Sequence, residues 1–217
     1  MKNKTLKHWF DYYQCDKSSS HSYHVVYEPY LDKFTTPFNL LEIGIFRGAS
    51  SRAFINCYDN VHYYGVDIFD RESVDIVSDL EDNPRFEFLK TDSTSDTSTK
   101  LIKDGWGDVL FDIIIDDGSH LHDDITTTFA NFYPMLKVGG TYFIEDVFPN
   151  TFEGLVFTNN KLTGQRNYFL DNNNKFNDKT FSNLLDTIEG VTPSTFEHID
   201  LRVQDNRTDS YILKITK

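Results

Sequence analysis

The stretch FNLLEIGIFRG, residues 38–48, is the most informative part of this chain about its fold. Its first six residues are mostly apolar, as expected of a strand that is buried on both faces of a parallel sheet. Gly44 and Gly48 then permit a tight turn and a close approach of a ligand to the next helix. The spacing is not the G-x-G-x-x-G of dinucleotide sites, and the loop lacks the lysine of a phosphate-binding loop. The stretch predicts a strand–turn–helix unit. Its loop either binds a ligand or has only a structural role.

Further apolar runs follow this one, and helical patterns separate them. The expected strands cover residues 38–43, 61–66, 85–89, 111–115 and 141–144, and the expected helices cover 49–58, 71–80, 97–103 and 121–136, with Gly139 and Gly140 closing the last helix. This alternation is typical of a parallel sheet with helices on both faces. The tail differs, because 196–203 and 211–215 are separated only by a polar turn and predict an antiparallel hairpin. We expect an α/β, doubly wound, Rossmann-like fold with a mostly parallel sheet of seven strands.

Two segments fall outside this alternation. Residues 5–13 and 23–34 carry apolar residues at helical spacing, so we expect an N-terminal helical segment over residues 1–36 and a main domain over 37–217. Residues 147–176 are rich in asparagine and irregular. A long segment that follows a strand is often a substrate loop, and a surface insertion is the alternative.

Composition excludes several classes of function. The formal net charge is −13, from 21 basic and 34 acidic residues, which disfavours nucleic-acid and membrane-surface binding and suits divalent cations. Two cysteines, Cys15 and Cys57, are too few for a disulfide framework. The first residues have no apolar run of a signal peptide, and no stretch approaches the length of a membrane span. We therefore expect a cytoplasmic protein.

Acidic residues follow four of the expected strands: Asp67, Asp92, Asp116 with Asp117, and Glu145 with Asp146. Ligands of open α/β sheets bind outside the carboxyl ends of the strands, so this row marks a site. An acid after the second strand is placed to accept hydrogen bonds from ribose hydroxyls. A helix cap is the alternative for Asp67, and capping by TDST, residues 91–94, is the alternative for Asp92.

The pattern most specific for chemistry is IDDGSH, residues 115–120, together with Glu145 and Asp146. Neighbouring parallel strands would bring Asp117, Glu145 and Asp146 together, and three such carboxylates repel one another unless a cation joins them. Oxygen ligands favour Mg²⁺, with Ca²⁺ or Mn²⁺ as alternatives. His120 suits a general base, with a ligand role as the alternative. The structural alternative is that Asp117 and Asp146 only cap helices and that His120 is a solvated loop residue. The other histidines (His8, His21, His24, His62 and His198) have no comparable context.

These motifs resemble those of class I methyltransferases that use S-adenosylmethionine (SAM), and within them the metal-dependent sugar O-methyltransferases of macrolide biosynthesis. The resemblance covers roughly residues 12–148 and includes 16–27 and MLKVGG, residues 135–140. The usual Thr-Asp-Lys-Gly-Ser of that family reads CDKSS here, residues 15–19. Catechol O-methyltransferases are similar in the order of a metal aspartate, a base three residues later and two further metal ligands. Their base is a lysine, where this chain has His120.

The resemblance implies a transfer of the SAM methyl group to a hydroxyl of a small molecule or glycan precursor, with a sugar or other vicinal diol as acceptor and a catechol-like phenol as second choice. It implies that His120 is the catalytic base, that Asp117, Glu145 and Asp146 hold Mg²⁺, and that the N-terminal segment is a lid. The residues expected to bind the cofactor are Glu42, Gly44, Gly48, Asp67, Asp92, Asp116, Lys17 and Tyr27. The sequence leaves open whether the chain forms a homo-oligomer. The alternatives are a Rossmann-type nucleotide-binding enzyme, a metal-dependent enzyme of other chemistry and a non-catalytic interaction protein.

Overall fold

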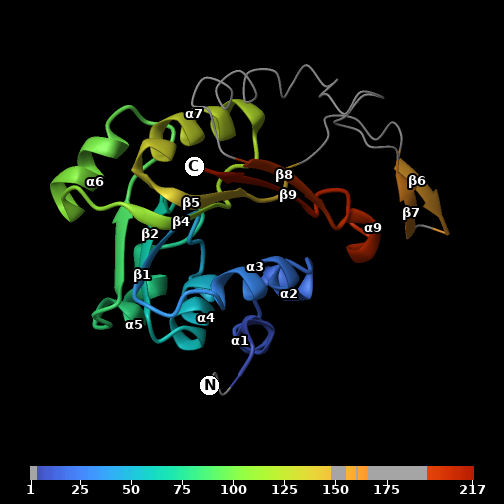
Figure 1. The fold of residues 1–217 in the computed structure, drawn as a ribbon, viewed down its shortest axis with the longest axis horizontal. Coiled ribbons are helices and arrows are strands. Elements are labelled where there is room, and N and C mark those ends of the chain that lie inside the picture. The colour runs from blue at the N-terminus through green and yellow to red at the C-terminus, as the bar shows by residue number, and fades with distance from the viewer. Residues whose placement is uncertain (1–3, 148–154, 160, 166–194) are drawn as a thin grey trace.

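The architecture is a seven-stranded sheet between two helical layers (Figure 1). The computed structural model describes residues 4–147, 155–159, 161–165 and 195–217. The strand order is β3-β2-β1-β4-β5-β9-β8; β1 to β5 run parallel, and β9 is antiparallel to both of its neighbours. The strand bounds are β1 Phe38–Ile43, β2 Val61–Asp67, β3 Phe86–Lys90, β4 Phe111–Asp116, β5 Leu136–Ile144, β8 Thr195–Asp200 and β9 Tyr211–Thr216. Strand order reverses between β1 and β4, which is where doubly wound sheets bind ligands.

The helices divide between the two faces of the sheet. One face carries α1 (Leu6–Tyr12), α2 (Asp16–Ser19), α3 (His24–Leu31), α4 (Ala49–Cys57), η1 (Val74–Val77) and α5 (Ser78–Glu81). The other face carries α6 (Ser98–Trp106), α7 (His122–Phe132) and η2 (Tyr133–Met135). Figure 1 shows α4 and α7 on opposite sides of the central strands. Within the described residues, no helix combines the length and the apolar character needed to cross a membrane.

Strand β1 shows why the sheet is buried on both faces. Phe38 and Leu40 point into the core beneath α1 to α5, and Leu41 and Ile43 point into the core beneath α6 and α7. Leu40 and Leu41 are both fully buried. A strand that lies between two helical layers needs apolar side chains at consecutive positions, which explains the continuous apolar run in the sequence.

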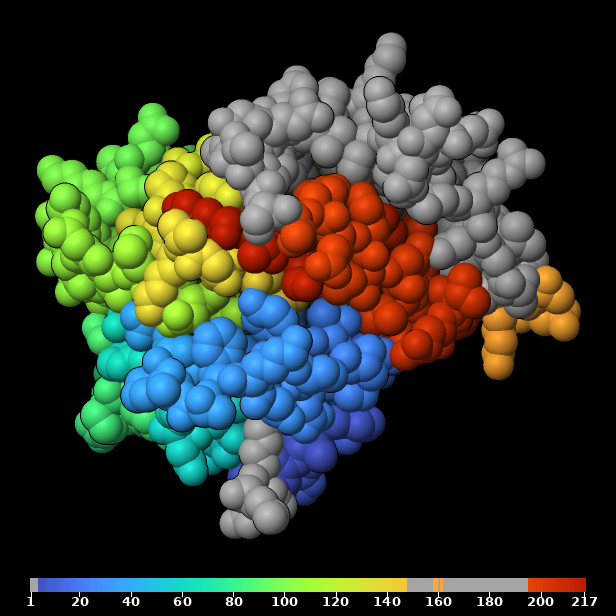
Figure 2. Space-filling model, viewed as in Figure 1, coloured from blue at the N-terminus to red at the C-terminus, as the bar shows by residue number. Residues whose placement is uncertain are grey.

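The N-terminal helices belong to the same core as the sheet. Phe10 and Tyr27 are fully buried, and the ring of Phe10 packs edge to face on Phe54 of α4 with centroids 5.4 Å apart. The backbone N–H of Ser22 donates to Asp205, which lies in α9 (Arg202–Asp205), over 3.0 Å. Figure 2 shows the N-terminal residues and residues 195–217 lying against each other on one face of the molecule. Packing of this kind makes residues 6–31 a structural part of the domain.

The structure confirms the parallel sheet and the C-terminal hairpin, and it corrects several boundaries. The helix expected over 121–136 ends at Phe132 and passes into η2, which contains Pro134. Gly139 and Gly140 do not close a helix but lie inside β5. A Cβ on Gly140 would approach the carbonyl oxygens of Asp112 and Lys137 to 2.9 Å, so glycine is needed where the register between β4 and β5 shifts.

Other corrections concern short elements. The helix expected over 71–80 is reduced to η1 and α5, and a further short helix, α2, lies between the two expected N-terminal helices. The turn of the C-terminal hairpin contains α9. Within the expected irregular segment 147–176, β6 (Leu155–Thr158) and β7 (Lys161–Gln165) form an antiparallel pair. The rest of that segment beyond Val147, and with it the expected substrate loop, lies outside the described residues.

Candidate active site

A cavity of about 550 Å³ opens at the carboxyl ends of the parallel strands. Small-molecule sites in proteins have volumes of this order. Its wall includes the ends of β1, β2, β3 and β4, and it therefore lies at the point where the strand order reverses. Five of the predicted site residues line it: Gly44, Asp67, Asp92, Asp117 and His120. The sequence thus predicted the place of the cavity and much of its wall.

Gly44 joins the first loop to the fourth strand. It has a φ of +92°, and a Cβ at this position would lie 2.0 Å from the carbonyl oxygen of Asp117. The close approach of two backbones therefore requires glycine here. Gly48 is the N-cap of α4 with a φ of +71°, and it does not line the cavity.

Asp67 holds the two loops that form one wall. Its Oδ2 accepts a hydrogen bond from the backbone N–H of Phe46 over 2.7 Å, and its Oδ1 accepts one from Phe69 over 2.6 Å. Phe46 and Phe69 have positive φ values of 50° and 49°, which are uncommon for phenylalanine. Strain of this kind concentrates at functional sites. Asp67 caps none of the helices that the structure describes, and its expected contact with a ribose stays a prediction.

Asp92 has the local bonds that its sequence context suggested. Its Oδ1 accepts from both the backbone N–H and the hydroxyl of Thr94, over 2.9 and 2.7 Å. The side chain nevertheless lines the cavity together with Thr91 and Ser93. A turn-forming role and a place in the wall are therefore compatible.

Glu42 and Asp116 lie behind the wall. Glu42 is fully buried, and its Oε2 accepts hydrogen bonds from Ser50 over 2.7 Å and from the hydroxyl of Tyr63. Asp116 is buried and accepts a hydrogen bond from Tyr142 over 3.2 Å. Burial raises the pKa of Asp116 to about 7. Neither residue lines the cavity, so their direct contact with a cofactor remains a prediction.

Asp117 and His120, which line the cavity, converge with Asp146, which does not. Their ligand atoms lie within 4.8 Å of one another. His120 Nε2 is 3.7 Å from Asp117 Oδ1 and 4.0 Å from Asp146 Oδ2. His120 and Asp146 both have positive φ values, 60° and 51°, so the backbone itself directs these side chains. Two carboxylates and an imidazole at this spacing suit a divalent cation, and the imidazole also suits proton transfer.

Glu145, the third expected metal ligand, has other partners. Its Oε2 accepts from Lys17 Nζ over 2.6 Å, and its Oε1 accepts from the hydroxyl of Tyr27. Lys17 also lies 2.5 Å from Asp117 Oδ2 and 3.5 Å from Glu42 Oε1. The sequence predicted a divalent metal ion at these acids, which stays a prediction, and the structure places the Lys17 ammonium between Asp117 and Glu145. Lys17 and Tyr27 are buried and do not line the cavity, so their expected contact with a cofactor also stays a prediction.

The protonation of Lys17 follows from its neighbours. Burial alone would lower the pKa of an ammonium group. Asp117, Glu145 and Glu42 outweigh this effect and raise the pKa of Lys17 well above its usual value. Lys17 is therefore a charged ammonium that is completely enclosed by protein.

Residues that the sequence interpretation missed come from the N-terminal segment. The hydroxyl of Tyr23 donates to Asp146 Oδ1. His21 is buried, its Nδ1 lies 2.8 Å from the hydroxyl of Ser210 and 3.7 Å from Asp146 Oδ1, and it forms a second group with Asp146 and Asp209. These contacts join positions more than 120 residues apart. The only signal for them was the resemblance of residues 16–27 to a family segment.

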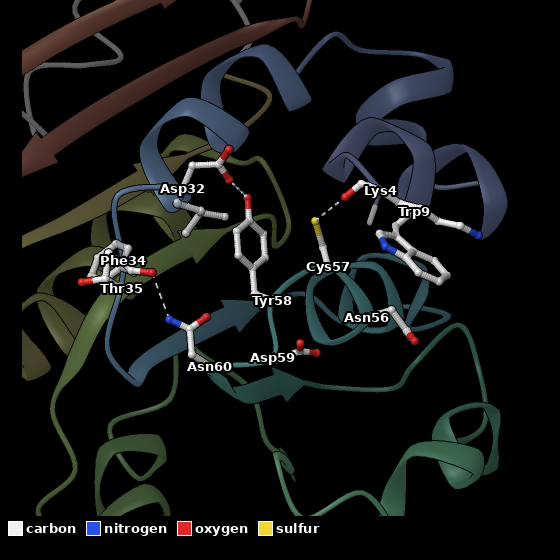
Figure 3. Close-up of a pocket in the computed structure, with 11 residues that line it drawn as sticks. Lys4, Trp9, Asp32, Phe34, Thr35, Asn56, Cys57, Tyr58, Asp59 and Asn60 are labelled. Carbon is white, nitrogen blue, oxygen red and sulfur yellow. Dashed lines mark hydrogen bonds between the residues drawn. The ribbon is translucent and has the colours of Figure 1, made fainter. Parts of the chain in front are cut away.

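A second cavity, of about 760 Å³, lies at the opposite edge of the sheet (Figure 3). Residues around the amino ends of β1 and β2 line it, including Phe34, Tyr58 and Asn60. Tyr58 donates to Asp32 over 3.1 Å, and Asn60 donates to the carbonyl oxygen of Phe34 over 3.0 Å. Among the described residues that line it there is no histidine, whereas His120 lines the cavity at the carboxyl ends.

Comparison with known proteins agrees with this geometry. Residues 41–147 match a family model described as "Methyltransferase domain". The chain is 31% identical over 143 residues to 8-demethyl-8-alpha-L-rhamnosyl tetracenomycin-C 2'-O-methyltransferase of Streptomyces olivaceus, covering 61% of this chain and 35% of that protein. It is 32% identical over 115 residues to mycinamicin VI 2''-O-methyltransferase of Micromonospora griseorubida, covering 50% and 27%. The chain thus spans about a third of the length of the curated relatives it matches.

Solved structures share the fold. The MycE methyltransferase from the mycinamycin biosynthetic pathway, in complex with Mg and SAH, superimposes with a TM-score of 0.68 at 23% sequence identity. The match covers 99% of this chain and 55% of that one. At this level of identity the likeness establishes the Rossmann-like methyltransferase fold.

Proposed function

Residues 41–147 match a methyltransferase-domain family model, and on this premise we propose that the chain transfers the methyl group of SAM to a hydroxyl in a metal-dependent reaction. One observation carries the proposal. Asp117 and His120 line the same cavity as Asp67 and Asp92, and the ligand atoms of Asp117, His120 and Asp146 lie within 4.8 Å of one another. A cofactor site and a proton-transfer site then share one cavity.

The cofactor is proposed to lie along the ends of β1, β2 and β3. Asp67 and Asp92 are the acids in that wall, and acids at these positions suit ribose and adenine groups. Gly44 lets the first loop approach the ligand closely. The wall also contains Asp16, Asp70, Glu72 and Asp124, so its charge favours a cationic sulfonium. In the relatives named above, the cofactor chemistry is methyl transfer, and the MycE complex holds SAH and Mg.

Asp117, His120 and Asp146 fit a divalent cation by their donor atoms and their spacing. When bound, the cation would lower the pKa of an acceptor hydroxyl and orient it. Glu145 is retained from the sequence as a proposed ligand, although its two oxygens bond Lys17 and Tyr27 in the structure.

His120 is proposed to remove the hydroxyl proton. Its imidazole is about one-third exposed and faces the cavity, so it is accessible to an acceptor. Asp117 and Asp146 lie within about 4 Å of its Nε2 and would stabilise the imidazolium that forms. The acceptor oxygen then attacks the methyl carbon, the carbon–sulfur bond breaks, and its electron pair returns to sulfur. Positioning supplies much of the rate, because the anion and the sulfonium neutralise each other.

The acceptor is proposed to be a sugar hydroxyl with a vicinal neighbour. The relatives carry names of sugar O-methyltransferases, such as L-olivosyl-oleandolide 3-O-methyltransferase of Streptomyces antibioticus. A catechol-like phenol presents the same pair of oxygens and is the second choice.

Transfer of a labelled methyl group from SAM to a panel of glycosides and catechols tests the proposal, with and without a chelator. We expect transfer to at least one diol, its loss with the chelator and its recovery with Mg²⁺. Transfer that does not depend on a metal would rule out the proposed metal dependence. SAM binding without transfer to any hydroxyl would rule out the proposed O-methyl transfer.

A further inference from the structure

The ammonium of Lys17 occupies the centre of the acid cluster formed by Glu42, Asp117 and Glu145. It is 1% exposed and lies 2.5 Å from Asp117 Oδ2, 2.6 Å from Glu145 Oε2 and 3.5 Å from Glu42 Oε1. A buried lysine needs such partners, because an unpaired buried charge costs several kcal/mol. The contacts join α2 to β1 and to the residues that follow β4 and β5.

The same N-terminal segment donates hydrogen bonds to two further carboxylate oxygens. Tyr27 donates to Glu145 Oε1, and Tyr23 donates to Asp146 Oδ1. Lys17 bonds Asp117 Oδ2 and Tyr23 bonds Asp146 Oδ1, so the oxygens of these two acids that the N-terminal segment does not bond are Asp117 Oδ1 and Asp146 Oδ2. Both face His120 Nε2, at 3.7 and 4.0 Å. A cation that recruits Glu145 would therefore share an oxygen with Lys17 or with Tyr27.

We infer that Lys17 is a positioning residue that shares Asp117 and Glu145 with the divalent cation, so that its ammonium opposes metal binding. The inference rests on the metal site of the proposed function. In the absence of the cation, Lys17 holds the carboxylates together that would otherwise repel one another. With the cation present, two positive charges compete for the same carboxylate of Asp117. The N-terminal segment then couples its own docking to the occupancy of the metal site.

The test compares Mg²⁺ binding to the wild-type chain and to Lys17→Met by calorimetry in the absence of SAM. We expect the variant to bind Mg²⁺ at least tenfold more tightly, and its melting temperature to rise more with Mg²⁺ than that of the wild type. Lys33→Met removes an exposed lysine and controls for net charge. This control should not change the Mg²⁺ affinity more than twofold.

Hydrogen exchange of the wild-type chain provides a second measurement that does not depend on the folding of the variant. We expect Mg²⁺ alone to accelerate exchange of the amides in residues 16–31, because the cation draws Asp117 and Glu145 away from Lys17. Slower or unchanged exchange, or equal or weaker Mg²⁺ binding by Lys17→Met, overturns the inference.

Titration of the same proteins with SAM separates the two ideas. If SAM does not bind but Mg²⁺ affinity responds to Lys17, the proposed function fails and the inference stands. If SAM binds and Mg²⁺ affinity does not respond to Lys17, the inference alone fails.

Discussion

Substitution of Gly44 by alanine tests whether the first loop and the end of β4 are packed backbone to backbone. The φ of +92° costs an alanine about 1–2 kcal/mol. The added Cβ lies 2.0 Å from the carbonyl oxygen of Asp117 and 2.7 Å from its carbonyl carbon, so one backbone must shift, which costs about 1–3 kcal/mol more. We expect Gly44→Ala to lower the free energy of unfolding by about 2–5 kcal/mol, a large part of the stability of an ordinary domain.

Two further glycines separate strain from collision. Gly139 has a φ of +81°, and a Cβ there meets nothing within 4 Å, so Gly139→Ala should cost only about 1–2 kcal/mol. Gly105 lies in α6, and a Cβ there meets Leu89 at an ordinary 3.5 Å, so Gly105→Ala should stabilise the chain by up to about 1 kcal/mol.

Urea unfolding followed by circular dichroism measures all three variants, and calorimetry measures their SAM affinity. Gly44→Ala should weaken SAM binding at least tenfold, because the shift displaces the wall of the cavity. The reasoning is refuted if Gly44→Ala costs no more than Gly139→Ala, or if it keeps wild-type SAM affinity.

Other variants test the site and the fold. His120→Ala should keep SAM affinity and lose methyl transfer by about 10²–10⁴-fold; near-normal turnover in a labelled-methyl assay would exclude it as the base. Asp146→Ala should raise the Mg²⁺ concentration needed for half-maximal transfer at least tenfold, and an unchanged requirement would exclude it as a ligand. Burial lowers the pKa of His198 to about 4, so the unfolded chain binds the extra proton as the pH falls below 6.5. Its contribution to stability is at most about 3 kcal/mol, is present above pH 6.5 and is lost towards pH 4. His198→Gln should therefore flatten the pH dependence of the urea midpoint across that window. Parallel pH profiles of the variant and the wild type would contradict this.

The ends of the parallel strands were predictable from local sequence. Strand β1 has the expected bounds because its apolar run is continuous and a glycine follows it directly. Strand β4 extends only one residue beyond the expected end, since Asp116 is buried although it is charged in water. The carboxyl edges of neighbouring parallel strands must meet, so the approach of Asp117 to Asp146 followed from the order of the chain.

The boundary between α7 and β5 was less predictable. Gly139 and Gly140 resemble a helix terminator in sequence, and their actual place in a strand depends on the register shift against β4. Propensity cannot report such a tertiary requirement. Proline at position 134 lies in η2 and ends the α-helical hydrogen bonding before the glycines are reached.

The contacts of the N-terminal segment could not be derived from spacing. Lys17 and Asp117 are 100 residues apart, and Tyr23 and Asp146 are 123 apart. A lysine in a polar run is usually a solvated residue, and nothing local distinguishes the fully enclosed ammonium of Lys17. The repulsion among the acids predicted a divalent metal ion at this site, and nothing in the sequence indicated that Lys17 would lie against Asp117 and Glu145.

Calorimetric titration of the Mg²⁺-loaded chain with SAM, with NAD as the control ligand, tests whether the carboxyl-edge cavity binds the methyl donor. We expect micromolar SAM binding, no NAD binding, and a loss of SAM affinity in Gly44→Ala. A folded chain that does not bind SAM, or that prefers NAD, would rule out methyl transfer and leave the carboxyl-edge cavity to a different chemistry.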